Sequence, residues 1–280
     1  MNIDLHIHTS ASDGSMTVGE VFEIAVRENM HMLAIADHDT IDSVDQSLDL
    51  AKETGITVIS GIEFSASYEM GLHILGYFVD YKNEKLTRVL DGFKKDRTLR
   101  IHRFIDELRK KDIDITFEDI KRNATGEILG RVHIAKALVE LGYANDVEEA
   151  FVRHLKDEIN KNTNREKISA KDCIELIAHA GGISVLAHPC YMYDEKFEFH
   201  LNELTSYGLN GIEIFHPDQS DEQAKMFEKI AIDKGLIVTA GSDFHGNVKP
   251  ELNIGCEKRT SEYLEFCVDL LYKKAKEIYR

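Results

Sequence analysis

Two histidines one residue apart, His6 and His8, lie near the start of the sequence and are followed by Asp13 before a glycine. Residues i and i+2 of an extended strand point to the same side, so both imidazoles would face one point. Imidazole nitrogens suit zinc, manganese and iron, and this spacing is typical of a metal site. The alternative is a pair of polar residues on an exposed strand face.

Further histidines and carboxylates follow other predicted strands at their carboxyl ends, where parallel α/β barrels build their active sites. Each one alone could be a helix N-cap or an ordinary polar group. Their common position at strand ends favours a shared metal site. Only His73 lies near the start of its strand. Nine such ligands would suit two or three divalent ions, with Mn, Fe and Zn equally compatible. The candidate metal ligands are His6, His8, Asp13, His38, Glu63, His73, His188, Asp243 and His245.

The elements that must position these residues follow from apolar runs that alternate with amphipathic stretches. This pattern predicts parallel strands joined by helical crossovers. Thr17-Val-Gly-Glu20 is a capping box that begins a helix, and Gly55 ends the next helix. Strands are predicted at residues 3–7, 32–36, 56–62, 72–79, 183–187, 211–215 and 236–240. Helices are predicted at residues 17–28, 42–53, 169–180, 220–235 and 261–279.

The middle of the chain has a different pattern. Charged stretches of helical period occupy residues 86–111, 115–123, 131–141 and 147–155. No buried strand is predicted between Val79 and Ile183, so we expect residues 82–165 to be a mainly helical insertion. Residues 156–167 are polar and weakly patterned, which is typical of a loop.

Composition limits the possible functions. The 280 residues suffice for one large α/β domain or a barrel with an insertion. A formal net charge of −16 argues against binding duplex nucleic acid, but bound cations could still attract a small phosphorylated substrate. Four cysteines without CxxC spacing, no signal peptide and no membrane-length apolar run predict a cytoplasmic protein that uses no membrane. The sequence does not indicate an oligomeric state.

The residue types indicate hydrolysis of phosphate esters. Two neighbouring divalent ions lower the pKa of a shared water and hold a phosphoryl oxygen. A metal-bound hydroxide would then attack phosphorus in line, so that no protein nucleophile is needed. The sequence contains no Gly-x-Ser-x-Gly elbow, Walker A loop or GxGxxG motif.

Six short motifs together resemble the PHP (polymerase and histidinol phosphatase) family. They are His6-x-His8, Ser12-Asp13-Gly14, Ala36-Asp37-His38-Asp39, Gly61-Ile-Glu63, Ala187-His188-Pro189 and Gly241-Ser-Asp243-x-His245. The resemblance implies an α/β fold, a distorted (β/α)7 TIM-like barrel formed by residues 1–81 and 166–280. Residues 82–165 would be a helical insertion that caps the active site. It also implies a metal-dependent phosphoesterase with two or three ions.

The same resemblance implies a role for each ligand. His6, His8, Glu63 and Asp243 would hold one ion, and Glu63 would bridge to a second ion that His73 and His188 also hold. Asp13, His38 and His245 would hold the third. Catalytic roles are expected for Asp13, His38, His245 and His216. The last lies in Gly211-Ile-Glu213-x-x-His216, which resembles a further family segment, and it would contact substrate or donate a proton to the leaving group.

One segment narrows the resemblance to a single branch of the family, namely Ile128-Leu-Gly-Arg131-Val-His133-Ile-Ala135. It is similar to a PHP branch that removes the 3′-phosphate of nucleoside 3′,5′-bisphosphates or trims short 5′-phosphorylated RNA. Arg131 and His133 are therefore expected to bind substrate, since arginine can grip a phosphate with two N–H groups. The alternative for Arg131 is an ordinary first residue of a helix. Val132 replaces a proline of the family motif, and residues 156–164 lack a glycine, a proline and a tyrosine common in relatives.

Three functions stay open from the sequence. The insertion and Arg131 favour a nucleotide phosphatase or short-oligonucleotide 5′-exonuclease. The second function is a small-metabolite phosphatase, such as one acting on histidinol phosphate. The third is a metal-binding module without turnover, and the complete set of nine ligands argues against it.

Overall fold

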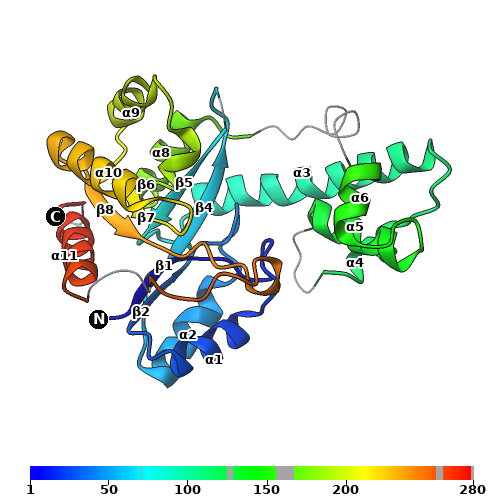
Figure 1. Cartoon of the computed structure of the whole chain (residues 1–280), viewed down its shortest axis with the longest axis horizontal. Helices are drawn as coiled ribbons and strands as arrows, with labels where there is room; N and C mark the ends of the chain where they lie inside the picture. The colour runs from blue at the N-terminus through cyan, green and yellow to red at the C-terminus, as the bar shows by residue number, and fades with distance from the viewer. Residues whose placement is uncertain (70, 125–128, 156–166, 257–260, 279–280) are drawn as a thin grey trace.

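The computed structural model describes the chain except residues 70, 125–128, 156–166, 257–260 and 279–280. It has a mixed α/β fold with two sheets and a group of helices carried on one long helix (Figure 1). Among the described helices, none is both long enough and apolar enough to cross a membrane.

The first sheet contains three parallel strands in the order β1-β2-β3. They are β1 (Ile3–Ile7), β2 (Met32–Ile35) and β3 (Thr57–Val58). Their crossovers are α1 (Val18–Arg27) and α2 (Val44–Thr54). The predicted capping box is present, with Thr17 accepting from the Glu20 N–H, and Gly55 ends α2 in a left-handed conformation. Local sequence signals therefore placed these helix ends correctly.

The second sheet contains five strands in the order β4-β5-β6-β7-β8. They are β4 (Gly61–Ala66), β5 (Leu72–Tyr77), β6 (Ile183–Leu186), β7 (Gly211–Phe215) and β8 (Ile237–Ala240). The prediction of parallel strands throughout was wrong for β5, which runs antiparallel to β4 and β6. The connection between β4 and β5 has too few residues for a helical crossover, so the chain can only turn back and pair antiparallel. The predicted strand 56–62 is also divided, because β3 and β4 belong to different sheets.

Isolated pairings join the two sheets at the ends of their strands. Ile7 pairs with Phe244 after β8, and His38 after β2 pairs with Glu63 in β4. The His8 N–H donates to the Phe244 carbonyl at 2.8 Å. One hydrophobic cluster includes residues from both sheets, such as Leu5, Phe64 and Ile212. The carboxyl end of β1 therefore lies beside that of β8, and the carboxyl end of β2 lies beside β4.

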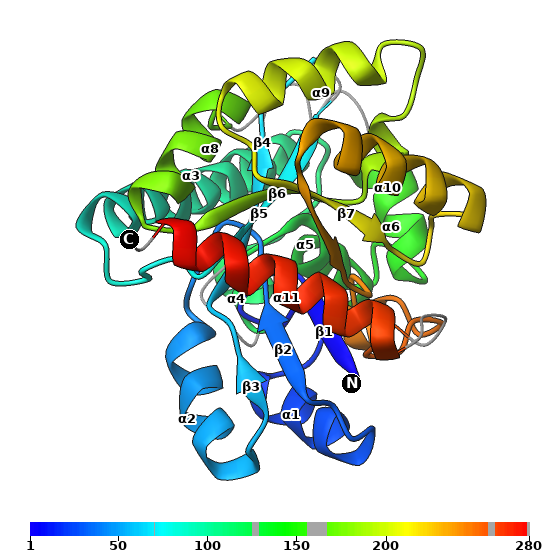
Figure 2. The same cartoon turned by 90° about the vertical axis from the view of Figure 1, so that its left-hand side faces the viewer.

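Helices after residue 168 cover the outer side of the second sheet. α8 (Ala170–His179) packs on β5 and β6, and α10 (Asp221–Lys234) packs on β7 and β8. α11 (Ser261–Ile278) packs on β8, and α9 (Phe197–Ser206) lies beyond β6 (Figure 2). Two short 3₁₀ helices follow strands, namely η1 (Pro189–Met192) after β6 and η2 (Gly246–Val248) after β8.

The middle of the chain is helical in its described part, as predicted. α3 (Glu84–Arg109) extends away from the sheets, and α4 (Phe117–Lys121), α5 (Arg131–Glu140) and α6 (Val147–His154) gather around its outer half (Figure 1). These helices have a hydrophobic cluster of their own, which includes Phe104, Ile134 and Leu138. The predicted loop 156–167 lies, apart from Lys167, outside the described residues.

Candidate metal centre

The structure brings all nine predicted ligands together where the ends of the two sheets meet. Three groups have ligand atoms within 4.8 Å of one another. The groups are His8, Asp13, His38 and His245; His6, His8 and Asp243; and His38, Glu63 and His73. His188 joins the last group through Glu63, with its Nε2 3.1 Å from Glu63 Oε1. Residues from both ends of the sequence therefore build one polar cluster.

His6 and His8 point to the same side of β1, as their spacing predicts. Their Nε2 atoms are 3.1 Å apart, and both side chains are fully buried. Burial alone lowers the pKa of His8, but the carboxylates of Asp243 and Glu63 outweigh it and raise the pKa to about 10. The pair therefore lies among carboxylates and not on an exposed strand face.

Glu63 is the centre of the cluster. Five imidazoles approach its carboxylate within 2.9–3.3 Å, from His6, His8, His38, His73 and His188. Its side chain is 1% exposed. Burial raises the pKa of Glu63, but the surrounding imidazoles, first that of His38, hold it well below the usual range. A carboxylate shared in this way could bridge two ions.

The antiparallel direction of β5 explains why His73 lies near the start of its strand, whereas the other candidates follow the ends of theirs. The start of an antiparallel strand lies at the carboxyl ends of its neighbours. His73 pairs with Ser65 near the end of β4, and its carbonyl accepts from the Ala187 N–H at 3.1 Å just beyond β6. His73 is thus at the same edge as the other candidates.

Asp13 lies at the open side of the cluster. Its carboxylate is 3.4 Å from His245 Nε2 and 3.8 Å from both His38 Nε2 and His8 Nδ1. Its side chain is 42% exposed. The neighbouring Gly14 passes so close to His8 that a Cβ here would lie 2.6 Å from the His8 carbonyl oxygen. The Ser12-Asp13-Gly14 motif therefore holds a carboxylate over the buried histidines.

Asp243 links several groups of the cluster. Its Oδ1 lies 3.5 Å from His6 Nε2 and 3.2 Å from His8 Nε2, and its Oδ2 lies 2.6 Å from Lys249 Nζ. Asp243 has φ 52°, and His188, two residues after β6, has φ 28°. Such conformations are costly for residues other than glycine and often occur at functional sites.

His216 lies in the cluster behind Asp243. Its side chain is fully buried, with Nε2 3.5 Å from Asp243 Oδ2. The Asp218 N–H donates to its Nδ1 at 3.2 Å. The structure therefore places this predicted catalytic residue against the candidate ligand Asp243.

Three buried carboxylates that support the cluster were missing from the predicted site. Asp4 accepts from the His6 N–H and from the backbone and hydroxyl of Ser242. Asp37 accepts from Thr9 and from the Ser12 hydroxyl. Glu213 lies 3.0 Å from His6 Nδ1 and accepts from the His188 N–H at 2.9 Å. The sequence signal for these carboxylates was their position in or directly after predicted apolar strands. Asp4, for example, lies two residues before His6.

A glycine after β8 lets these groups approach one another. A Cβ on Gly241 would lie 2.2 Å from the Cβ of His6 and 2.8 Å from Glu213 Oε1. Neither distance is possible for real atoms. The Gly241-Ser242-Asp243 motif therefore requires glycine because the backbone packs directly on His6.

The donor set fits divalent metal ions. His8 Nδ1, His38 Nδ1, Glu63 Oε2 and His216 Nε2 are buried and make no hydrogen bond with suitable geometry within the described residues. Leaving a buried polar atom unsatisfied costs about 1–3 kcal/mol. Buried ligand atoms without a hydrogen bond in such a crowded cluster are expected when their lone pairs are directed at common ions. Imidazole and carboxylate ligands suit Mn, Fe and Zn.

The predicted substrate-binding residues lie at the start of α5. Arg131 is exposed, with its guanidinium 5.7 Å from the centre of the Phe151 ring. It lines a pocket of about 40 Å³ together with Arg97 and Arg100 of α3. Arg97 also donates to Asp39 at 2.8 Å and to the His38 carbonyl at 3.4 Å. A basic pocket thus connects the helical region to the strand end that carries His38.

His133 is buried and neutral at pH 7. Its Nδ1 accepts from the Gly130 N–H at 2.9 Å. Burial, with a smaller contribution from Lys136, lowers the pKa of His133 to about 4, and the Asp13 carboxylate opposes this shift.

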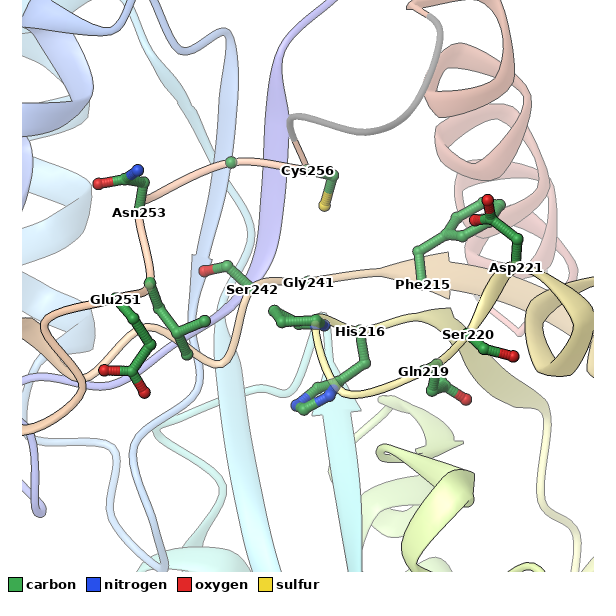
Figure 3. Close-up of a pocket in the computed structure, with 13 residues that line it drawn as sticks. Phe215, His216, Gln219, Ser220, Asp221, Gly241, Ser242, Glu251, Asn253 and Cys256 are labelled. Carbon is green, nitrogen blue, oxygen red and sulfur yellow. The ribbon is translucent and has the colours of Figure 1, made fainter.

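A cavity of about 340 Å³ lies on another side of the cluster, between loops that follow β7 and β8. Figure 3 shows His216, Gln219 and Ser242 in its wall, with Asp221 and Glu251 also present. These two carboxylates make the cavity unfavourable for a phosphate group.

The chain is similar to several characterised proteins. The PHP domain family model matches residues 4–239. A 5′-3′ exoribonuclease of Haemophilus influenzae is 34% identical over 245 residues, which cover 86% of this chain and 89% of that protein. A 3′,5′-nucleoside bisphosphate phosphatase of Chromobacterium violaceum is 30% identical over 249 residues, which cover 87% of each.

A solved structure has the same fold. It is described as a metal-dependent phosphoesterase of Bifidobacterium adolescentis, and it matches this chain with a TM-score of 0.78 and 30% identity. The match covers 90% of each chain.

Proposed function

Because the chain belongs to the PHP domain family of phosphoesterases, we propose that it is a metal-dependent hydrolase acting on nucleotides. The substrates proposed are nucleoside 3′,5′-bisphosphates, which would lose the 3′-phosphate, or short 5′-phosphorylated oligonucleotides. The observation that supports hydrolysis best is the convergence of nine imidazole and carboxylate groups, with Glu63 at their centre.

We assign these nine groups to two or three divalent ions, of which Mn, Fe and Zn all suit the donors. Glu63 would bridge two of them, and His8, which lies in two of the three groups, is a second candidate for a shared position. Such ions, when bound, activate water for attack and offset charge on the phosphoryl oxygens. The ligands are His6, His8, Asp13, His38, Glu63, His73, His188, Asp243 and His245.

The side chains around the cluster would bind and orient the substrate. Asp13, His38 and His73 have the more exposed side chains of the nine, at 42%, 14% and 32%, so the reacting phosphate would enter from their side. Asp13, His38 and His245 would act directly at the reacting phosphate. His216 would instead hold Asp243 in position, because its ring is fully buried behind that carboxylate.

The insertion would recognise the rest of the nucleotide. Arg131 would bind a second phosphate from the pocket it shares with Arg97. His133 would stay neutral and offer its Nε2–H to a phosphate oxygen, since Nδ1 is already an acceptor. By their names, one of the relatives described above acts on RNA and the other on nucleoside bisphosphates, which supports substrates built from nucleotides.

The proposal includes a barrel domain and a cap domain. The pairings Ile7–Phe244 and His38–Glu63 support a closed, distorted (β/α)7 barrel formed by residues 1–81 and 166–280. The separate hydrophobic cluster of α3 to α6 supports a cap domain at residues 82–165.

The test is a panel of phosphate esters with Mn²⁺, Zn²⁺ or Fe²⁺ added singly to the metal-depleted protein. Phosphate release is measured from adenosine 3′,5′-bisphosphate, a 5′-phosphorylated trinucleotide, histidinol phosphate and glycerol 2-phosphate. We expect kcat/KM to be highest for one of the two nucleotide substrates. A preference for histidinol phosphate would indicate a small-metabolite phosphatase, and no turnover with any metal would indicate a binding module.

A further inference from the structure

We propose that Tyr191 is the platform on which the base of the nucleotide substrate stacks. This inference rests on the proposed function and adds a residue that recognises the nucleoside. Tyr191 lies in η1, three residues after the candidate ligand His188. It is 62% exposed, which is unusual for a large aromatic side chain beside a buried polar cluster.

The ring of Tyr191 borders the metal centre directly. Its centroid lies 5.0 Å from the ring of His188 and 6.0 Å from the ring of His216. A phosphate held at the cluster is separated from its base only by a ribose. The base of a bound nucleotide would therefore lie within reach of the exposed part of this ring.

A hydrogen bond keeps the ring in place. The Tyr191 hydroxyl donates to the carboxylate of Asp218 in the loop after β7. The Asp218 N–H in turn donates to His216 Nδ1 at 3.2 Å. Because the phenol end is already tethered, stacking a base on the ring costs less side-chain entropy than ordering a free tyrosine.

Stacking would give affinity without base selection, since every base has an aromatic face. Such contacts typically change affinity about 5- to 150-fold per base when the aromatic ring is removed. The neighbouring Tyr193 does not have this geometry, since its ring packs on Phe197 and Phe227. Of these two tyrosines, Tyr191 has both an exposed ring and a ring contact with His188 of the cluster.

The experiment compares Tyr191→Leu and Tyr191→Phe with the unchanged protein, all loaded with the metal that gives most activity. The control is Phe199→Leu, which alters an aromatic residue of similar exposure, 64%, on α9. Calorimetry measures binding of adenosine 5′-monophosphate and, separately, of inorganic phosphate. Steady-state kinetics with adenosine 3′,5′-bisphosphate and glycerol 2-phosphate separate KM from kcat.

For Tyr191→Leu we expect nucleotide affinity to fall about 10- to 100-fold while phosphate affinity stays within about twofold. KM for the bisphosphate should rise while kinetics with glycerol 2-phosphate stay unchanged. Tyr191→Phe should keep most of the affinity, and Phe199→Leu should keep all of it.

Unchanged nucleotide affinity in Tyr191→Leu would overturn the proposal, as would an equal loss of phosphate binding, which would show that Tyr191 only supports His188. If the unchanged protein hydrolyses glycerol 2-phosphate but no nucleotide, the proposed function fails and this inference fails with it. If it hydrolyses the bisphosphate and Tyr191→Leu does so equally well, the inference alone fails.

Discussion

His6 Nδ1 lies 3.0 Å from Glu213 Oε1, and both side chains are completely buried although 207 positions separate them in the sequence. This contact leaves His6 Nε2 directed at His8 and Glu63. The second oxygen of Glu213 accepts from the His188 N–H, so one carboxylate orients two candidate ligands. Carboxylates in this position orient metal-binding imidazoles and make them more basic.

We predict that Glu213→Gln weakens metal binding about 10- to 100-fold. Glutamine keeps the shape but removes the negative charge that holds the His6 ring. Competition with a chromophoric chelator measures the metal affinity. The control is Glu203→Gln, which alters a carboxylate that accepts hydrogen bonds from the hydroxyls of Tyr68 and Tyr207. Equal affinities in the two variants would contradict a role for Glu213 in orienting ligands.

Asp13→Ala and His245→Ala should each abolish turnover with little change in thermal stability. Asp13 is 42% exposed, and the buried His245 lies 3.4 Å from it within the polar cluster, so their removal takes away metal ligands without opening the hydrophobic core. We expect kcat to fall at least about 100-fold, judged from phosphate release beside melting curves. Asp42→Ala, which removes a surface ion pair with Lys94, should behave like the unchanged protein. Near-normal rates in either site variant would refute the assignment of the third ion.

Arg131→Ala should reduce kcat/KM for the bisphosphate about 10- to 100-fold, which corresponds to loss of a charge-assisted contact of about 1.5–3 kcal/mol. The effect should be smaller for glycerol 2-phosphate, which has no second phosphate. Arg27→Ala on α1 is the matched control, because the Arg27 side chain is 69% exposed and forms an ion pair with the neighbouring Glu28. An unchanged kcat/KM would remove Arg131 from the phosphate site.

Metal removal should abolish activity and lower the melting temperature. Ions bound only by the folded state would stabilise it by about 2.7 kcal/mol at 100 times the dissociation constant. The measurement is a melting curve with chelator, followed by stepwise addition of Mn²⁺, Zn²⁺ or Fe²⁺ and an activity assay at each step. A melting temperature independent of all three ions would contradict the metal centre.

His133 should make stability depend on pH. Its pKa is about 4 in the folded protein against 6.5 ordinarily, so the unfolded state binds more protons between these values. The stability present above pH 6.5 is therefore lost as the pH falls through this window. Urea unfolding with chelator should show that the unchanged protein loses about 1–2 kcal/mol more than His133→Gln between pH 7 and 5. Glutamine at this position can still accept from the Gly130 N–H. Parallel losses in both proteins would refute the prediction.

Local sequence patterns were sufficient for much of the fold. The capping box at Thr17 and Glu20, the terminal Gly55 and the helical periods of α3 to α6 act over a few residues, so they are visible in the sequence. The same holds for His6 and His8, because the period of a strand alone turns both side chains to one side. These predictions, which depended on short-range geometry, were confirmed.

Tertiary structure decided which distant groups meet. The reversal of β5 brings His73 to the edge that holds Glu63, and the return of β7 and β8 to β1 places Glu213 against His6 and Asp243 against His8. The orienting roles of Asp4, Asp37 and Glu213 arise only when strands far apart in the sequence bury these carboxylates beside one another. The sequence by itself determined the ligand types and their positions on local elements. The contacts among them depend on how the sheets pack, because pairing between strands is not encoded within any single segment.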